Sequence, residues 1–180
     1  RTDLVIVLGG DGTVHEAING LAELEIRPIL GILPGGTCND FSRMLRIPQN
    51  LVRAAKILMQ GKTQLLDVGK VNDHYFLNFW GVGLVADTST NIDAGQKKVL
   101  GKLSYFLSAL KTMQAAEPFH FTLEADEHHL KGEAVMILVM NGRYIGTNQI
   151  PFPNMKIDDG LFDVLIVRDS TFGSFIEVFN

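Results

Sequence analysis

The sequence predicts an α/β domain with a parallel sheet, followed by a second domain of mostly antiparallel β-structure. Up to residue 61, apolar runs of strand length alternate with segments of helical periodicity, in the order strand, helix, strand, helix, helix. Both apolar runs in this part end in a glycine-rich turn, which is typical of parallel strands that lead into helices. After residue 63 most runs have strand length and are separated by turn residues. We therefore predict one domain over residues 1–64 and another over residues 65–180.

The elements of the first domain follow from short segments. Leu4–Leu8 and Ile29–Leu33 are continuous apolar runs, which predict buried parallel strands. The helix after the first run has apolar residues at helical spacing, namely Val14, Ala17, Ile18, Leu21 and Leu24. A short helix is expected after the second run, with Thr37 near its start. The segment PQNLVRAAKILMQG predicts a third helix, which Gly61 would end.

The second domain is predicted from turns and apolar runs. Asn72-Asp73 lies between two strand-like segments and indicates a tight hairpin. One helix is expected where four leucines form a stripe, at Leu100, Leu103, Leu107 and Leu110. Three further segments predict strands: FHFTLEA, LKGEAVMILVMN and LFDVLIVR.

Composition excludes several classes of protein. The formal net charge is −4, so bulk attraction to nucleic acid or to anionic lipid is not expected. The single cysteine excludes a disulfide within the chain and fits a reducing compartment. The longest apolar run, AVMILVM, is far shorter than the ~18 residues of a membrane-spanning helix, and the start shows no secretory signal pattern. We therefore expect a cytoplasmic protein. Because the chain starts and ends within patterned segments, we expect both domains to be truncated.

The stretch LGGDGTVHEAING, residues 8–20, places the carboxylate of Asp11 in a glycine turn. Backbone N–H groups of such a turn commonly face a phosphate at the start of a helix. A carboxylate would repel that phosphate unless a cation such as Mg²⁺ lay between them. The stretch lacks the Gly-x-Gly-x-x-Gly spacing of dinucleotide sites, and GKT at residues 61–63 is no P-loop because Lys56 occupies the first glycine position. The alternative is an ordinary turn that needs glycine for positive φ.

The stretch LPGGTCNDF, residues 33–41, is a second glycine turn with a carboxylate, Asp40. Parallel strands end at the same edge of a sheet, where α/β sheets bind ligands. Asp11 and Asp40 could then share one Mg²⁺, directly or through waters. Alternatively, Asp40 is an acid at a helix start, stabilised there by only ~0.3–1 kcal/mol. Arg43 could point at phosphate or be solvated.

Four stretches, in this order, resemble the diacylglycerol kinase catalytic-domain family in its bacterial lipid-kinase branch. They are GGDGTVHEAING, GILPGGTCNDFSRML, LDVGKVNDHYFLN and KIDDGLFDV. NAD kinases and phosphofructokinases share a GGDG-type turn, but the Pro-Gly-Gly-Thr-x-Asn-Asp that follows is similar to the lipid kinases. The resemblance implies a nucleotide-binding α/β domain of the phosphofructokinase and NAD-kinase type, a second domain on the lipid side, and a cleft between them.

The same resemblance implies site residues. ATP would contact Thr37 and the first turn, at Gly10, Asp11, Gly12, Thr13, Val14, His15 and Glu16. Asp11 and Asp40 would organise a network of Mg²⁺, water and nucleotide. KIDDGLFD resembles the family's structural Mg²⁺ loop, in which Asp159 would supply a carboxylate and Lys156 and Leu161 would supply backbone carbonyls. An ordinary β-turn is the alternative for this loop.

Two parts of the family pattern do not occur in the sequence. The family's first strand and its Asn-Pro-type turn would precede Arg1, and its Asp-Gly-Glu, which provides the base for the acceptor hydroxyl, would follow Asn180. No catalytic base is therefore assigned, and we expect these 180 residues alone to be inactive.

The function that the resemblance implies is ATP- and Mg²⁺-dependent phosphorylation of a lipid hydroxyl, with diacylglycerol as the first choice of acceptor. Sphingoid bases, phosphatidylglycerol and other polyol lipids stay open. Other classes are a non-catalytic nucleotide-binding regulator and a soluble-metabolite kinase of the NAD kinase type. The expected partner is a lipid at a membrane surface, reached by peripheral contact and without nucleic acid. Exposed edge strands would also permit a homodimer.

Overall fold

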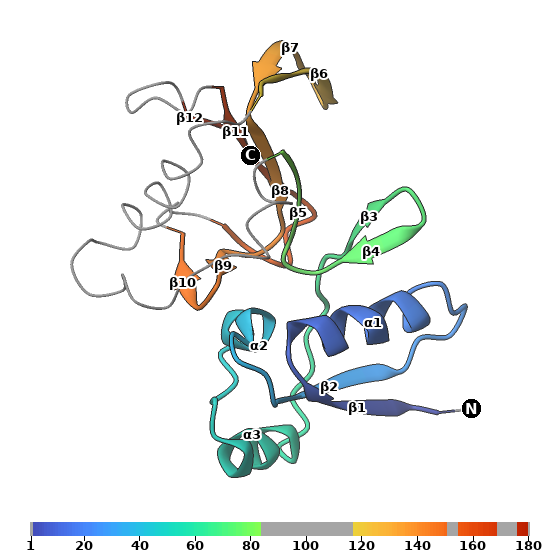
Figure 1. The fold of residues 1–180 in the computed structure, drawn as a ribbon. Coiled ribbons are helices and arrows are strands. Elements are labelled where there is room, and N and C mark those ends of the chain that lie inside the picture. The colour runs from blue at the N-terminus through green and yellow to red at the C-terminus, as the bar shows by residue number, and fades with distance from the viewer. Residues whose placement is uncertain (1, 84–116, 151–154, 169–175, 180) are drawn as a thin grey trace, which may run out of the picture. The chain divides into compact units, whose positions relative to one another are not determined.

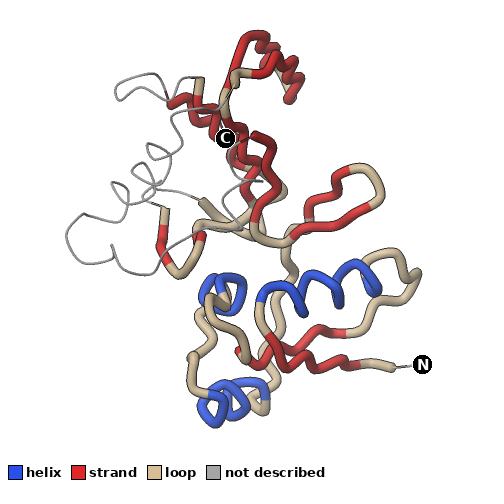
Figure 2. The backbone as a smooth tube through the Cα atoms, in the orientation of Figure 1, coloured by secondary structure: helices blue, strands red, loops and turns tan. Residues whose placement is uncertain are grey.

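The computed structural model describes residues 2–83, 117–150, 155–168 and 176–179. The chain divides into two compact units. The first unit contains Arg1–Phe79 and Asn141–Leu161, and the second contains Trp80–Met140 and Phe162–Asn180. The described helices all belong to the first unit, whereas the described part of the second unit is built from strands and their connections (Figure 2). The predicted division of the chain into residues 1–64 and 65–180 stays a prediction.

The first unit is centred on two parallel strands, as the sequence predicts. β1 (Leu4–Gly9) pairs with β2 (Ile29–Pro34) in parallel, from Leu4 opposite Ile29 to Gly9 opposite Pro34. Helix α1 (Asp11–Leu21) packs on one face of the pair, while α3 (Leu51–Leu58) lies on the other (Figure 1). The core beneath α1 contains Val7, Val14, Ile32, Phe41 and Leu77.

Strand β1 is buried on one face only. Val7 is 9% exposed, whereas Leu4, Ile6 and Leu8 are 51–60% exposed. Side chains alternate between the faces of a strand, so only every second residue points toward α1. The prediction of a buried strand is therefore wrong for this face of β1, because α3 packs mainly against β2.

The helices begin and end close to their predicted positions, with two differences. Helix α1 ends at Leu21, which leaves Leu24 outside the helix and exposed. Helix α2 (Asp40–Met44) begins three residues after Thr37, because Asn39 adopts a left-handed conformation with φ of 52°. The predicted end of α3 is confirmed: Gly61 has φ of 67° and donates its N–H to the Leu58 carbonyl.

Two hairpins complete the first unit. β3 (Gly69–Val71) and β4 (His74–Phe76) are antiparallel around Asn72-Asp73, which confirms the predicted turn. β9 (Tyr144–Ile145) and β10 (Asn148–Gln149) form a second hairpin. Its turn residues Gly146 and Thr147 both have positive φ, 57° and 70°. Such values are typical of two-residue hairpin turns.

The second unit contains a four-stranded sheet in the order β12 (Ile176–Phe179), β11 (Asp163–Val167), β8 (Met136–Met140) and β5 (Phe79–Gly83). β11 is antiparallel to both β8 and β12, and β6 (Phe119–Ala125) pairs with β7 (His128–Ala134) as a hairpin. The buried core contains Ala134, Ile137, Val164 and Ile166. These pairs confirm the predicted antiparallel character.

Two predictions for the second unit need comment. The segment LKGEAVMILVMN forms two strands, β7 and β8, which are separated at Val135, rather than one. The predicted helix with the leucine stripe at Leu100–Leu110 lies outside the described residues. In the part of the chain that the structure describes, no helix has the length and apolar character needed to cross a membrane.

Candidate active site

The two glycine turns lie against each other at the carboxyl end of the parallel strands. The Gly35 N–H donates to the Gly9 carbonyl over 2.8 Å. A Cβ atom on Gly36 would overlap the Cα of Gly10, so these backbones approach more closely than other residue types allow. The arrangement brings the backbone of both turns to the start of α1.

Asp11 connects the first turn to α2. It is the first residue of α1 and is half-buried. Its Oδ1 accepts a hydrogen bond of 2.9 Å from the Phe41 backbone N–H. Within the described residues, no hydrogen bond is made to its other oxygen, Oδ2. Asp11 therefore holds the two turns together and keeps one carboxylate oxygen for a ligand.

Asp40 has a different environment, although it occupies the equivalent place after the second turn. It is only 5% exposed, and both its oxygens accept backbone N–H groups of the β9–β10 turn. The distances are 2.6 Å from Gly146 and 2.7 Å from Thr147. Both oxygens of Asp40 are therefore occupied by hydrogen bonds within the protein. The geometry thus favours Asp11 over Asp40 as a direct ligand for a cation.

The pKa of Asp40 is raised above its ordinary value of 3.8. Burial is the main cause, and the negative charge of Asp11 adds to it. The N–H groups of Thr147 and Gly146 and the positive charge of Arg43 act in the opposite direction. Asp11 and Asp40 are therefore near enough to influence each other, as a shared Mg²⁺ network would need, but their place in that network stays a prediction.

The loop that carries Thr37 is held by its own neighbours. Asn39 Oδ1 accepts the Gly36 N–H and its Nδ2 donates to the Gly36 carbonyl, each over 2.8 Å. Arg43 Nε donates to the Cys38 carbonyl over 2.8 Å. Arg43 therefore stabilises the loop. Neither of the two expectations for Arg43, contact with phosphate or solvation, included this hydrogen bond. Thr37 is exposed on the loop and remains available to a ligand.

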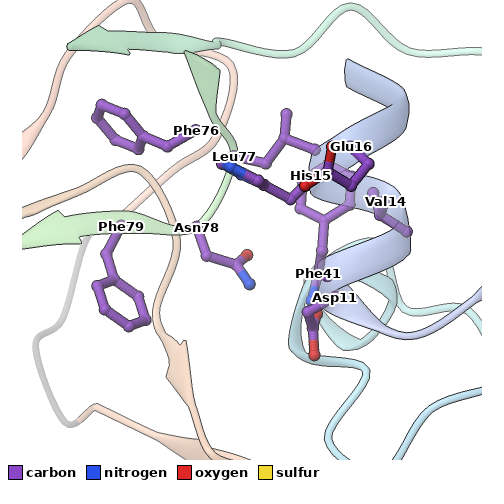
Figure 3. Close-up of a pocket in the computed structure, with 10 residues that line it drawn as sticks. Asp11, Val14, His15, Glu16, Phe41, Phe76, Leu77, Asn78 and Phe79 are labelled. Atoms are coloured by element: carbon purple, nitrogen blue, oxygen red, sulfur yellow. Dashed lines mark hydrogen bonds between the residues drawn. The ribbon is translucent and has the colours of Figure 1, made fainter. Parts of the chain in front are cut away.

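A cavity of about 300 Å³ opens beside the start of α1 (Figure 3). Five of the predicted ATP-binding residues line it, namely Asp11, Gly12, Val14, His15 and Glu16. The other three, Gly10, Thr13 and Thr37, are not among its lining residues. Phe41 lies beside Asp11, and the segment Phe76–Phe79 forms the opposite wall. The cavity therefore combines carboxylates with aromatic and aliphatic surface.

Two asparagines hold the wall formed by residues 76–79, and the sequence analysis did not single them out. Asn19 on α1 accepts the Tyr75 N–H over 2.8 Å and donates to the Tyr75 carbonyl over 2.9 Å. Asn141 is 1% exposed and donates to the carbonyls of Leu77 and Asp67, each over 2.8 Å. Asn141 ends an apolar run, and that position was the available signal for it. The sequence gives no comparable signal for Asn19, which lies outside the apolar positions of its helix.

The predicted structural metal loop lies on a neighbouring segment of the first unit. Asp67 Oδ2 accepts the Gly160 N–H over 2.8 Å, and the Asp67 N–H donates to the Ile157 carbonyl over 2.8 Å. Asp159 is exposed, and its Oδ1 accepts the Leu161 N–H over 3.2 Å. Three or more His, Cys, Asp or Glu side chains do not cluster for a metal among the described residues. A site with one carboxylate, Asp159, and the carbonyls of Lys156 and Leu161 stays a prediction.

Comparisons with known proteins identify the family of the chain. Residues 1–71 match the family model of the diacylglycerol kinase catalytic domain, and residues 81–180 match that of the YegS C-terminal NAD kinase beta sandwich-like domain. A protein of Staphylococcus carnosus (strain TM300) named "Putative lipid kinase" is 40% identical over 93% of this chain and 55% of its own length.

Solved structures give the same result. A crystal structure of "a putative diacylglycerol kinase from Bacillus anthracis str. Sterne" is 50% identical, with a TM-score of 0.78, and the match covers 93% of this chain and 56% of that one. Another diacylglycerol kinase structure from that strain is 48% identical with a TM-score of 0.74, over 92% and 54% of the two chains. The chain thus spans about half the length of the curated relatives it matches. The two family models together extend over nearly all of its residues, and the chain belongs to the diacylglycerol kinase catalytic-domain family, in the branch of the bacterial lipid kinases.

Proposed function

We propose that the protein containing this chain is an ATP-dependent lipid kinase that transfers the γ-phosphoryl group of ATP to a lipid hydroxyl. Diacylglycerol, converted to phosphatidic acid, is the leading acceptor, which would place the enzyme in phospholipid synthesis. The observation that carries the proposal is the contact between the two glycine turns beside the open oxygen of Asp11. Backbone N–H groups at the start of a helix suit phosphate, and a carboxylate oxygen next to them suits Mg²⁺.

The chain's own residues can hold a nucleotide and its metal ion. Gly10, Gly12 and Thr13 lie at the start of α1, and Thr37 is exposed on the adjoining loop. Asp11 Oδ2 would bind Mg²⁺ directly or through a water, with Asp40 behind it. When bound, the ion neutralises charge on the phosphates during transfer.

The acceptor and the cellular place are proposed with the reaction. The aromatic and aliphatic wall of the cavity suits a molecule that carries hydrocarbon next to its hydroxyl. A cytoplasmic enzyme would meet such a molecule at the inner face of the membrane through peripheral contact. A homodimer formed through edge strands belongs to the same proposal.

The test is an acceptor panel with radiolabelled ATP and the full-length protein. The panel contains diacylglycerol, sphingosine, phosphatidylglycerol and NAD. We expect label in phosphatidic acid and a requirement for Mg²⁺. Transfer to NAD would instead favour a soluble-metabolite kinase, and transfer to no acceptor would favour a nucleotide-binding regulator.

We also propose that the loop at residues 156–161 binds Mg²⁺ for structure. A divalent ion on Asp159 would offset the repulsion between Asp158 and Asp159 and would stabilise the folded state by mass action. Mg²⁺ should then raise the melting temperature without ATP, and Asp159→Asn should abolish that increase while Asp11→Ala should not. An equal increase in Asp159→Asn and wild type would show that the ion binds elsewhere.

A further inference from the structure

Asn78 is a polar residue in the apolar wall of the cavity. It lies between Leu77 and Phe79, and its backbone carbonyl accepts the N–H groups of Asn141 and Gly142, each over 2.8 Å. Its side-chain oxygen Oδ1 is closed off from solvent and has no hydrogen-bond partner in the described residues. An amide among apolar side chains costs free energy unless its polar atoms are hydrogen-bonded, and a ligand that accepts from the Nδ2 group would account for its presence in this wall.

The amide is directed into the cavity. Figure 3 shows the Asn78 side chain turned toward the side on which Asp11 and Phe41 lie. A Cβ on Gly142 would lie 3.3 Å from Asn78 Oδ1, so this oxygen is held close to the Gly142 backbone. The Nδ2 group, a hydrogen-bond donor, is then the part of the amide that can reach a ligand.

Asp11 supplies the complementary group on the opposite side. Its Oδ1 is bonded to the Phe41 N–H, and the lone pairs of Oδ2 can accept from a hydroxyl beside the water through which this oxygen would hold the proposed Mg²⁺. A hydroxyl group donates one hydrogen bond and accepts others, so it satisfies an amide N–H and a carboxylate oxygen together. The apolar walls contributed by Val14, Phe41 and Phe79 suit the carbon chain that carries the hydroxyl.

Other ligand groups fit this pair less well. An ionised phosphate has no hydrogen to donate and could approach the carboxylates of Asp11 and Glu16 only through a cation, whereas a hydroxyl group needs none. An adenine ring pairs with an asparagine through both atoms of the amide, but Asn78 Oδ1 is closed off. The polar pair therefore favours an alcohol over a nucleotide base at this position.

We propose that Asn78 binds and positions the acceptor hydroxyl, which donates to Asp11 and accepts from Asn78 Nδ2. This inference rests on the proposed function, because the hydroxyl is the one that receives phosphate. In the transfer, a bond forms between the hydroxyl oxygen and the γ-phosphorus, and the bond from that phosphorus to the oxygen shared with the β-phosphate breaks. ADP keeps the electron pair of the broken bond, and the hydroxyl proton passes to a carboxylate base. Asn78 is neutral and takes no proton, so it acts by holding the oxygen.

The test uses the full-length protein and two lipids, diacylglycerol and the analogue in which hydrogen replaces the hydroxyl. Binding to both is measured in detergent micelles, together with acceptor and ATP kinetics. Wild type should bind the hydroxyl lipid about tenfold more tightly than the analogue, and Asn78→Ala should bind both equally. The variant should lose about tenfold in kcat/KM for the acceptor, with the KM for ATP changed less than twofold.

Two further variants keep the result interpretable. Asn148→Ala is the matched control, since Asn148 lies in the β9–β10 hairpin and does not line the cavity. It should retain the discrimination between the two lipids. If Asn78→Ala lowers the melting temperature, Asn78→Ser keeps a hydrogen-bond donor and should recover part of the discrimination.

The outcomes separate this inference from the proposed function. Unchanged discrimination in Asn78→Ala overturns the inference while leaving lipid kinase activity in place. A raised KM for ATP with unchanged acceptor kinetics overturns it in favour of a nucleotide contact. If the wild-type protein phosphorylates no lipid, the proposed function is overturned. The role of Asn78 in phosphoryl transfer is then overturned too, even if Asn78 discriminates between the two lipids.

Discussion

The turn that follows β1 and the turn that follows β2 look alike in sequence but place their aspartates in different environments. Each ends a parallel strand with a glycine pair, and each leads to an aspartate at the first position of a helix. Asp11 is half-buried and keeps one oxygen for a ligand, whereas Asp40 is buried and binds two backbone N–H groups. A shared local pattern therefore fixes where an acid lies, but not what it contacts.

The lengths of the two helices explain the difference. Helix α1 has 11 residues and packs on the sheet through Val14. Helix α2 has only five residues, too few to be stable by itself. Its first residue, Asp40, is bonded to Gly146, 106 positions away in the sequence. We infer that Asp40 fixes α2 and the second turn in place, which leaves Asp11 for the ligand.

The largest effect is expected from Asp11→Ala in the full-length protein. The variant removes the open carboxylate oxygen that is proposed to hold Mg²⁺. Phosphoryl transfer should fall by roughly 10²–10³-fold, as for the loss of one preorganised electrostatic group. The melting temperature should change little, because one hydrogen bond at a half-buried position is lost. Normal activity in this variant would contradict the role of the first turn.

Asp40→Ala should cause a large loss of stability, in contrast to Asp11→Ala. The Gly146 and Thr147 N–H groups lose a charged partner, and hydrogen bonds to charged groups contribute about 1.5–3 kcal/mol each. Because burial of the carboxylate opposes this gain, we expect the free energy of unfolding to fall by about 2–3 kcal/mol. Urea unfolding measures this change in the free energy of unfolding. A stability equal to wild type would show that the hairpin does not depend on Asp40.

The contact between the two turns can be tested with Gly36→Ala. The added Cβ would overlap Gly10, so the turns must separate, at a cost of about 1–3 kcal/mol typical of overpacking. Gly12→Ala is the matched control, since no atom lies within 4 Å of its added Cβ. Gly12→Ala should unfold within about 0.5 kcal/mol of wild type. Equal effects of the two substitutions would mean that the turns are not in close contact.

Structural features that depend on residues close together in the sequence could be predicted. The parallel pair, the helix after each turn, the end of α3 and the hairpin at Asn72-Asp73 all follow from local periodicity and turn chemistry. The two glycine turns were placed at one sheet edge because parallel strands end there. These features needed no knowledge of distant contacts.

Contacts between distant segments could not be predicted in this way. Nothing near Asp40 indicates that its oxygens bind the β9–β10 turn, and nothing near Asn19 indicates a pair of hydrogen bonds to Tyr75. The open face of β1 was missed because an apolar run does not reveal how much of each face a neighbouring helix covers. The role proposed for Asn78 depends on its position relative to Gly142 and Asp11, which lie far from it in the sequence.

The smallest expected effect is on the titration of Asp40, and it measures how strongly the two turns are coupled. The pKa of Asp40 is raised first by burial and then by the charge of Asp11. Asp11→Asn removes that charge and should lower the pKa of Asp40, while burial continues to raise it. The folded state with a raised pKa holds the proton more tightly than the unfolded state. Asp40 therefore contributes most to stability below pH 3.8, and its contribution falls as the pH rises through the raised pKa.

The carboxyl carbon of Asp40, followed by NMR from pH 3 to 8 in wild type and in Asp11→Asn, reports the change in the pKa of Asp40 directly. Identical titration curves would mean that Asp11 and Asp40 do not interact, and a shared Mg²⁺ network between them would then lose its support.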